Sequence, residues 1–216
     1  MSRLLDLRVA GAAAMLLAAA GLAWHGQPDV AQKWEFLAPK YEPRLIEREV
    51  YIDPAELLHL MNDDYIDLLI FDVRNEPDWN QFHLADAERI PMDQLPAQRD
   101  RLRALPENAV VVAVSNDEIL ATDAWKRLMV IARPNVYILA GGLNMWLTVY
   151  GPAEAAPGVH GATNLAQPDG RLRHRFTMAL GARHAAARPD EHLAPQRDYT
   201  PKVRLLKKIA RAGGCG

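Results

Sequence analysis

The chain has 216 residues, half of them hydrophobic, which is enough for one domain of ordinary size with additional segments. Its single cysteine, Cys215, excludes an internal disulfide and a cysteine-rich metal site, and a formal net charge of −2 gives no reason to expect a nucleic-acid partner. Residues 170–216 hold 11 basic and 3 acidic residues (net +8), so residues 1–169 carry −10. Such a basic tail has either its own partner or no role beyond being solvated.

The first segment, residues 1–25, is apolar from Val9 to Trp24 and is preceded by Arg3 and Arg8. As a helix, residues 9–24 would rise roughly 24 Å, somewhat short of the roughly 30 Å hydrocarbon core. We predict an uncleaved transmembrane anchor, with a cleaved signal segment as the alternative, because small residues at 18–21 fit a cleavage site. A buried core helix is a third option. The preceding arginines predict that the rest of the chain lies outside the cytoplasm. The Ala/Arg-rich composition is compatible with a bacterial source, so we expect a single-pass inner-membrane protein with its main domain in the periplasm.

Residues 26–47 are polar, contain three prolines and show no sustained hydrophobic period. Proline at these positions is typical of irregular chain rather than of a helix interior. We therefore predict a linker over residues 26–47.

Residues 48–150 alternate between apolar runs and helical patterns. The runs at 66–73, 109–115 and 135–140 are continuous, as expected of strands buried on both faces. Helical segments separate them, the first of which begins with Asp53 as its N-cap and Pro54 at its first position. This alternation predicts an α/β domain with three layers, in which helices cover both faces of a central parallel sheet.

Two ordered motifs in this region resemble the signatures of rhodanese-like domains. The stretch 71–91 carries an Asp-Val-Arg at a strand end, followed by an aromatic, a His-Leu, an Ala and an Ile-Pro, and the stretch 136–146 carries a Gly-Gly and a Trp. The matching residues are Asp72, Val73, Arg74, Trp79, His83, Leu84, Ala87, Ile90, Pro91, Gly141, Gly142 and Trp146. The resemblance covers about residues 48–150 and implies the rhodanese-like fold.

Between its two signatures the family keeps an active-site loop that begins with a Cys and ends near an Arg. The resemblance places that Cys position on Ser115, and the loop comprises Ser115, Asn116, Asp117, Glu118, Ile119, Leu120 and Ala121. The loop glycine of the family corresponds to Glu118 and its Arg to Leu120. Serine forms no persulfide, and two carboxylates oppose an anionic sulfur donor. The sequence thus predicts a pseudoenzyme with no catalytic residue, no cofactor and no metal.

The other matching residues have structural interpretations. We expect Asp72 and Arg74 to form a hydrogen-bonded pair that holds the loop, His83 to order a turn, and Trp79 and Trp146 to pack in the core. Ile119 and Leu120 are apolar where an active loop would face solvent, so exposure of both would indicate a contact surface. The dispersed histidines His174, His184 and His192 lack the spacing of metal ligands.

Residues 151–216 form a basic C-terminal extension, for which we predict an irregular course and a short terminal helix at 201–212. Val203, Leu206 and Ile209 share one face of that helix, which fits docking to a protein partner or to anionic lipid, a frayed end being the alternative. We therefore predict a binding or scaffolding subunit of a larger assembly that is attached to the membrane by its N-terminal helix. Its protein partners would be bound by the tail and by loop 115–121. The competing hypothesis is a role in sulfur metabolism, as a sulfurtransferase or sulfur carrier that uses Cys215 or a partner's thiol.

Overall fold

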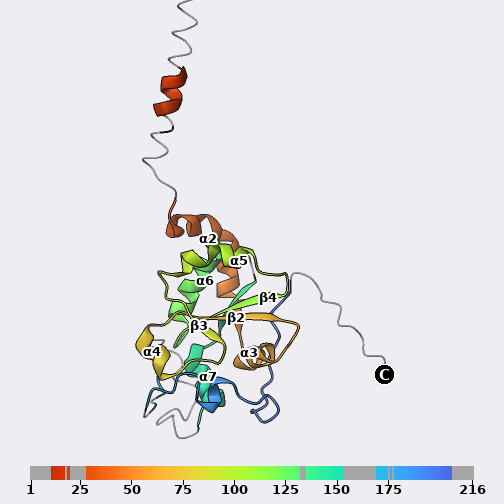
Figure 1. The fold of residues 1–216 in the computed structure, drawn as a ribbon. Helices are drawn as coiled ribbons and strands as arrows, with labels where there is room; N and C mark the ends of the chain where they lie inside the picture. The colour runs from red at the N-terminus through yellow and green to blue at the C-terminus, as the bar shows by residue number, and fades with distance from the viewer. Residues whose placement is uncertain are drawn as a thin grey trace, which may run out of the picture.

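The computed structural model describes residues 11–17, 19, 28–131, 135–152, 169–174, 176 and 178–205. Its centre is a five-stranded parallel sheet with the order β1-β5-β4-β2-β3 (Figure 1). The strands are β1 (Tyr51–Ile52), β2 (Asp67–Asp72), β3 (Ala87–Arg89), β4 (Ala109–Val114) and β5 (Val136–Leu139). The predicted α/β fold with a central parallel sheet is confirmed.

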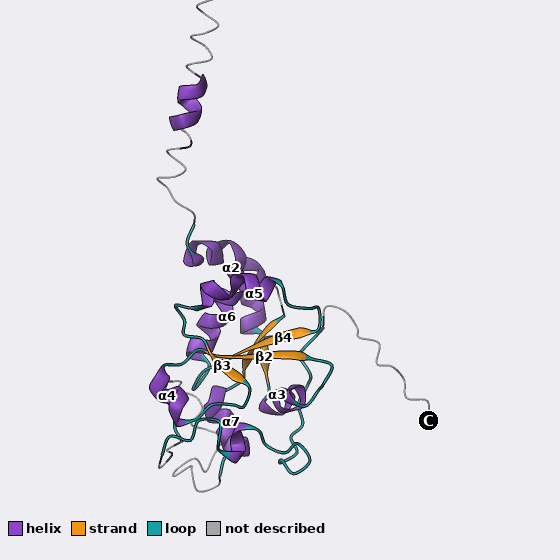
Figure 2. Ribbon diagram, in the orientation of Figure 1, coloured by secondary structure: helices purple, strands orange, loops and turns teal. Residues whose placement is uncertain are grey.

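Helices cover both faces of this sheet (Figure 2). On one side lie α2 (Val30–Ile46), α5 (Arg99–Arg103) and α6 (Ile119–Ile131), and on the other lie α3 (Pro54–Met61) and α7 (Gly142–Tyr150). The short helix α4 (Glu76–Gln81) follows β2, and two 3₁₀ turns, η1 (Leu95–Gln98) and η3 (Ala185–Ala187), complete the named elements. The result is a three-layer arrangement with one hydrophobic core on each face of the sheet.

Strand β4 shows why the continuous apolar runs of the sequence form central strands of the sheet. Each of its residues is buried, and alternate side chains enter opposite cores. Val111 and Ala113 pack on the α6 side, whereas Val110, Val112 and Val114 pack on the α7 side. A strand has this two-residue period, so a continuous run of β-branched residues fits a strand covered on both faces.

The predicted linker at 26–47 is wrong for most of its length, because residues 30–46 form helix α2. Asp29 accepts a hydrogen bond from the Gln32 backbone N–H, and the Gln32 side chain accepts one from the Asp29 N–H, which together make a capping box. Pro39 and Pro43 lie inside the helix. Tertiary packing of α2 against α6 outweighs the local cost of these prolines.

Part of the C-terminal extension beyond residue 150 packs against the domain. Ala186 and Ala187 are fully buried in the core on the α7 side, and Trp146 donates its Nε1–H to the Ala186 carbonyl at 2.7 Å. The backbone N–H of Ala85 donates to Ala187 at 2.9 Å. Residues 178–205 are therefore part of the folded body.

The predicted terminal helix at 201–212 does not begin where the sequence placed it. Residues 201–205 are not helical, and the backbone N–H groups of Lys202 and Val203 both donate to Oε1 of the buried Glu56, at 2.7 and 2.8 Å. Val203 packs against the core instead of offering a docking face. Leu206 and Ile209 lie outside the described residues.

Within the described residues, no helix combines the length and apolar character needed to span a bilayer. Much of the predicted anchor, including residues 9, 10 and 20–24, lies outside the described part of the chain. The anchor stays a prediction.

Candidate functional site

Loop 115–118 connects β4 to α6 at the carboxyl edge of the sheet, where α/β proteins commonly place their ligands. Ser115, the first residue of the loop, is buried. Its hydroxyl donates to the Asp117 carbonyl at 2.5 Å and accepts from the Ala121 N–H at 3.0 Å. The single hydroxyl proton is thus committed to the loop backbone.

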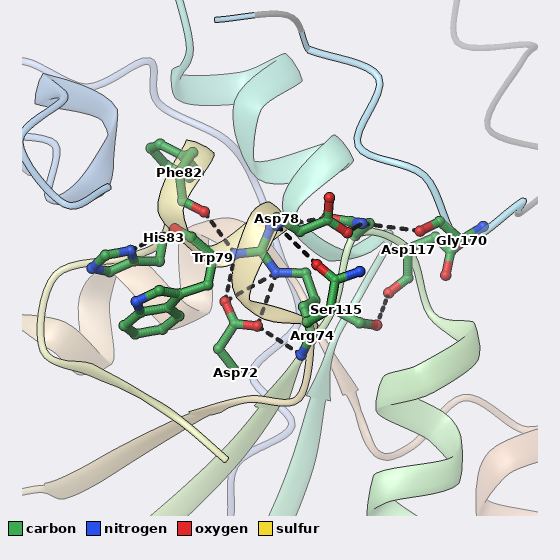
Figure 3. A network of polar contacts seen from close by, with 11 residues as sticks. Asp72, Arg74, Asp78, Trp79, Phe82, His83, Ser115, Asp117 and Gly170 are labelled. Atoms are coloured by element: carbon green, nitrogen blue, oxygen red, sulfur yellow. Dashed lines mark hydrogen bonds and ion pairs between the residues drawn. The ribbon is translucent and has the colours of Figure 1, made fainter. Parts of the chain in front are cut away.

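A buried ion pair supports the loop from below (Figure 3). Arg74 donates Nε–H to Oδ1 of Asp72 at 2.8 Å and Nη2–H to Oδ2 at 2.6 Å, and both side chains are almost inaccessible to solvent. The remaining donors of Arg74 reach the Phe82 carbonyl at 2.6 Å and Oδ1 of Asn116 at 2.9 Å. With its charge paired and its hydrogen bonds made, Arg74 joins β2, α4 and the loop.

The two loop carboxylates are bound to groups of this chain. Asp117 accepts the Ile119 N–H at 2.8 Å and the Gly170 N–H at 2.6 Å. Glu118 accepts the Gly141 N–H at 2.7 Å and both terminal nitrogens of Arg48, the shorter at 2.6 Å. The Glu118 carboxylate raises the pKa of the Arg48 guanidinium above its ordinary value. Both carboxylates therefore use backbone donors that an external anion would need.

A segment of the C-terminal extension crosses the loop. We call residues 169–173 the strap. Asn116 donates its side-chain N–H to Gly170 at 2.9 Å and to Asp78 at 2.8 Å. Asn144, in the first turn of α7, donates to the Arg171 carbonyl and accepts the Arg173 N–H, each at 2.8 Å. The strap, α4 and α7 thus meet over the loop (Figure 3).

The turn formed by Gly141 and Gly142, at the start of α7, approaches the other side of the loop. Leu143 and Asn144 donate their backbone N–H groups to the carbonyls of Ser115 and Asn116, at 2.9 and 3.0 Å. Gly142 has φ +59°, and a Cβ there would lie 2.5 Å from the backbone oxygens of Ser115 and Asp117. Only glycine permits this approach.

Residues 53–148 match the family model described as the rhodanese-like domain. The chain contains a rhodanese-like domain. Among solved structures, the BH2092 protein from Bacillus halodurans is 22% identical, with a TM-score of 0.40, covering 50% of this chain and 78% of that one. A protein from Lactobacillus plantarum is 23% identical, with a TM-score of 0.39, covering 52% and 93% respectively. Among curated proteins, none matched the chain.

His83, Trp79 and Trp146 occupy structural positions in the rhodanese-like domain. The ring of His83 stacks on Trp79 with 3.6 Å between centroids, and its Nδ1 lies 2.9 Å from the Trp79 carbonyl. Trp79 is only half-buried, so it packs beside the core rather than within it, whereas Trp146 is fully buried. None of the three forms a hydrogen bond with Ser115.

Two apolar side chains of the rhodanese-like loop reach solvent. Ile119 and Leu120 open α6 and are 47% and 37% exposed, while Ala121 behind them is buried. A cavity of about 360 Å³ lies on the outer side of the loop. Its charged lining includes two ion pairs, Arg48–Glu118 at 2.6 Å and Arg197–Asp53 at 2.9 Å, so its walls do not favour a free anion.

Sequence reasoning missed the strap, because nothing in residues 169–173 beyond the Asp-Gly turn signal indicates where the segment docks. Cys215 lies outside the described residues, so its reactivity stays a prediction. In the part of the chain that the structure describes, no group of three or more His, Cys, Asp or Glu could hold a metal ion. His174 is buried, and this burial lowers the pKa of its imidazole.

Proposed function

We propose that this chain is a catalytically silent rhodanese-like domain that acts as a binding or scaffolding subunit of a larger assembly. The single observation that carries the proposal is the state of Ser115. It stands at the mouth of the loop, and its hydroxyl is committed to Asp117 and Ala121. A hydroxyl held in this way offers no nucleophile.

The chemistry of sulfur transfer explains why this matters. A thiolate attacks the outer sulfur of a donor, an S–S bond forms, and the donor leaves with the electron pair of its broken bond. An alcohol is barely ionised at neutral pH without a dedicated base, and oxygen forms no stable equivalent of the persulfide. No side chain bonded to the Ser115 hydroxyl supplies such a base, since both hydrogen-bond partners of the hydroxyl are backbone groups.

Access supports the same conclusion. The strap closes one side of the loop to a sulfur donor, because Gly170 contacts both Asn116 and Asp117. The donors that would hold an anion, such as the Ile119 and Gly141 N–H groups, are already bound to loop carboxylates. The loop is stabilised from within and leaves little for a substrate.

The surface of the loop supports a role in binding. Exposed Ile119 and Leu120 form an apolar surface at the first turn of α6, which is suited to binding a protein partner. The apolar N-terminal segment after two arginines supports attachment to a bacterial inner membrane, with the domain on the periplasmic side. We infer that the domain presents the loop face to an assembly in that compartment.

Turnover of thiosulfate and cyanide tests the silent site. The full-length protein and Ser115→Cys should both yield no thiocyanate above the uncatalysed rate. Ser115→Cys restores the sulfur atom, but it restores neither free N–H donors for an anion nor access of a substrate to the loop. We therefore expect its turnover to stay at least about a thousandfold below that of an active enzyme, a typical loss when hydrogen-bond donors to the transition state are missing. Matched thermal melting would show that the variant is folded. Robust turnover by Ser115→Cys would contradict the covered-loop argument, and turnover by the native chain would contradict the proposed function.

Pull-down tests the binding role. The native protein, solubilised in mild detergent, should retain partners that Leu120→Asp loses, while Leu193→Asp, at another exposed leucine, retains them. Equal retention by both variants would exclude the loop face as the contact.

A further inference from the structure

Helix α2 carries two apolar stripes on opposite sides. The inner stripe faces the domain, where Trp34 and Tyr41 each contact Trp125 edge-on, with ring centroids 5.9 and 6.5 Å apart. Leu45 continues this stripe against the same core. The inner stripe alone accounts for the attachment of α2 to the domain.

The outer stripe consists of Phe36, Pro39, Pro43 and Ile46. Their spacing of three, four and three residues places them along one line of the helix, about half a turn around from Trp34 and Tyr41. Each is exposed, and Phe36 and Ile46 are 84% and 76% accessible. A helix that is apolar on two opposite faces is normally covered on both.

The two prolines add a second feature to the outer face. Pro39 and Pro43 have no N–H, so the carbonyls of Glu35 and Pro39 lack the donor that a helix normally provides four residues later. Those carbonyls need water or another polar group. Apolar side chains beside such carbonyls suit the boundary between headgroups and acyl chains, which offers both environments.

The chain that precedes α2 identifies what covers this face. The apolar segment ends at Trp24 and α2 begins at Val30, so residues 25–29 can span about 20 Å when fully extended. On its side of the sheet, α2 is the outermost layer, beyond α5 and α6 (Figures 1 and 2). A bilayer that holds residues 9–24 would therefore lie within reach of α2, whose outer stripe is exposed and apolar.

We propose that the outer stripe of α2 lies on the surface of the lipid bilayer and fixes the orientation of the domain to the membrane. The inference rests on the anchoring part of the proposed function. Glu35, Lys40 and Glu42 flank the stripe, are all exposed and together carry a net charge of −1, so they do not attract anionic lipid. Contact would thus depend on apolar burial rather than on anionic lipid, and it should be insensitive to salt.

Site-specific fluorescence in vesicles tests the contact. In full-length protein with Cys215→Ser, a single Phe36→Cys carries an environment-sensitive fluorophore, and the protein is reconstituted into phosphatidylcholine vesicles. The matched control is Met178→Cys, 67% exposed in a segment that packs on the opposite face of the sheet. Nitroxide groups attached to lipid should remove most of the fluorescence at position 36 and little at 178, and aqueous iodide should show the reverse.

Vesicle flotation separates this inference from the proposed function. Protein that floats with the vesicles while position 36 is as open to iodide as position 178 would overturn the lipid contact and leave the anchor standing. Protein that does not float would overturn the anchor and the lipid contact together, with no bearing on the silent loop. Shielding of position 36 that grows with protein concentration, without quenching from lipid, would assign the stripe to a second copy of the chain and overturn the lipid contact.

Discussion

Helix α2 and the C-terminal extension flank the rhodanese-like domain, and each covers one of its two cores. Helix α2 is regular and binds through side chains, with Trp34 and Tyr41 against Trp125. The extension has little regular structure and binds largely through its backbone: Gly170, Ala186 and Val203 each use main-chain groups to bond side chains of the domain. Both segments were predicted to be irregular, and both are part of the folded domain. Side-chain packing holds α2, and backbone hydrogen bonds hold the extension.

This difference between the two segments determines which of their surfaces stay available for binding. A helix held by one apolar stripe leaves its other face available for a partner or a bilayer. A segment held by its own N–H and C=O groups commits them to the domain, and it covers the loop as it does so. The strap therefore covers part of the loop, whereas the outer face of α2 stays exposed.

Removal of the extension should have the largest effect. Truncation after residue 168 takes Ala186 and Ala187 out of the core and deprives Trp146 and Glu56 of their hydrogen-bond partners. We expect a loss above about 5 kcal/mol, comparable to the whole stability of many domains. Thermal melting by circular dichroism measures this. Removal of residues 1–47 should cost less, and a truncated protein with an unchanged melting curve would show that the extension is only peripheral.

The two faces of α2 should respond unequally to truncation of an aromatic side chain. Trp34→Ala removes an edge contact with Trp125 and should cost about 2 kcal/mol in the free energy of unfolding. Phe36→Ala, at an exposed site, should change it by less than about 0.5 kcal/mol in detergent. Denaturant titration compares them. Equal losses would mean that the outer stripe packs within the folded chain itself.

The smallest effect is a pH dependence at Glu56. Burial raises the pKa of this carboxyl above its ordinary value, although the N–H groups of Val203 and Lys202 offset part of the shift. Between the unfolded and the raised folded pKa the native state binds more protons, so stability falls as pH rises through that window, by at most about 1.4 kcal/mol per pH unit. Glu56→Gln keeps an acceptor for both N–H groups and removes the titration.

Melting from pH 4 to pH 8 compares Glu56→Gln with the native protein. The variant should gain stability relative to the native chain as pH rises across the window and should then level off. A constant difference between them across the whole range would mean that folding does not shift the pKa of Glu56 from its ordinary value. Glu42→Gln, at an exposed site on α2, is the control for a charge change alone.

Much of the central domain could be predicted because its information is local. Continuous apolar runs predicted the strands, and alternation with helices predicted a parallel sheet. The capping box of Asp29 and Gln32 was equally visible, but Pro39 and Pro43 outweighed it in the interpretation of residues 26–47. A helix that docks through Trp34 and Tyr41 tolerates prolines on its other face, and only the packing reveals which face that is.

The sequence by itself determined the layered α/β fold, the position of Ser115 at the mouth of the loop and the lack of a thiol there. Each of these depends on side-chain type and on spacing within one segment. Only the tertiary structure decided that the strap covers the loop, because Gly170 reaches Asp117 across 53 residues through a backbone N–H that every residue except proline possesses. Main-chain contacts leave no pattern of side-chain types in the sequence, so they could not be predicted from it.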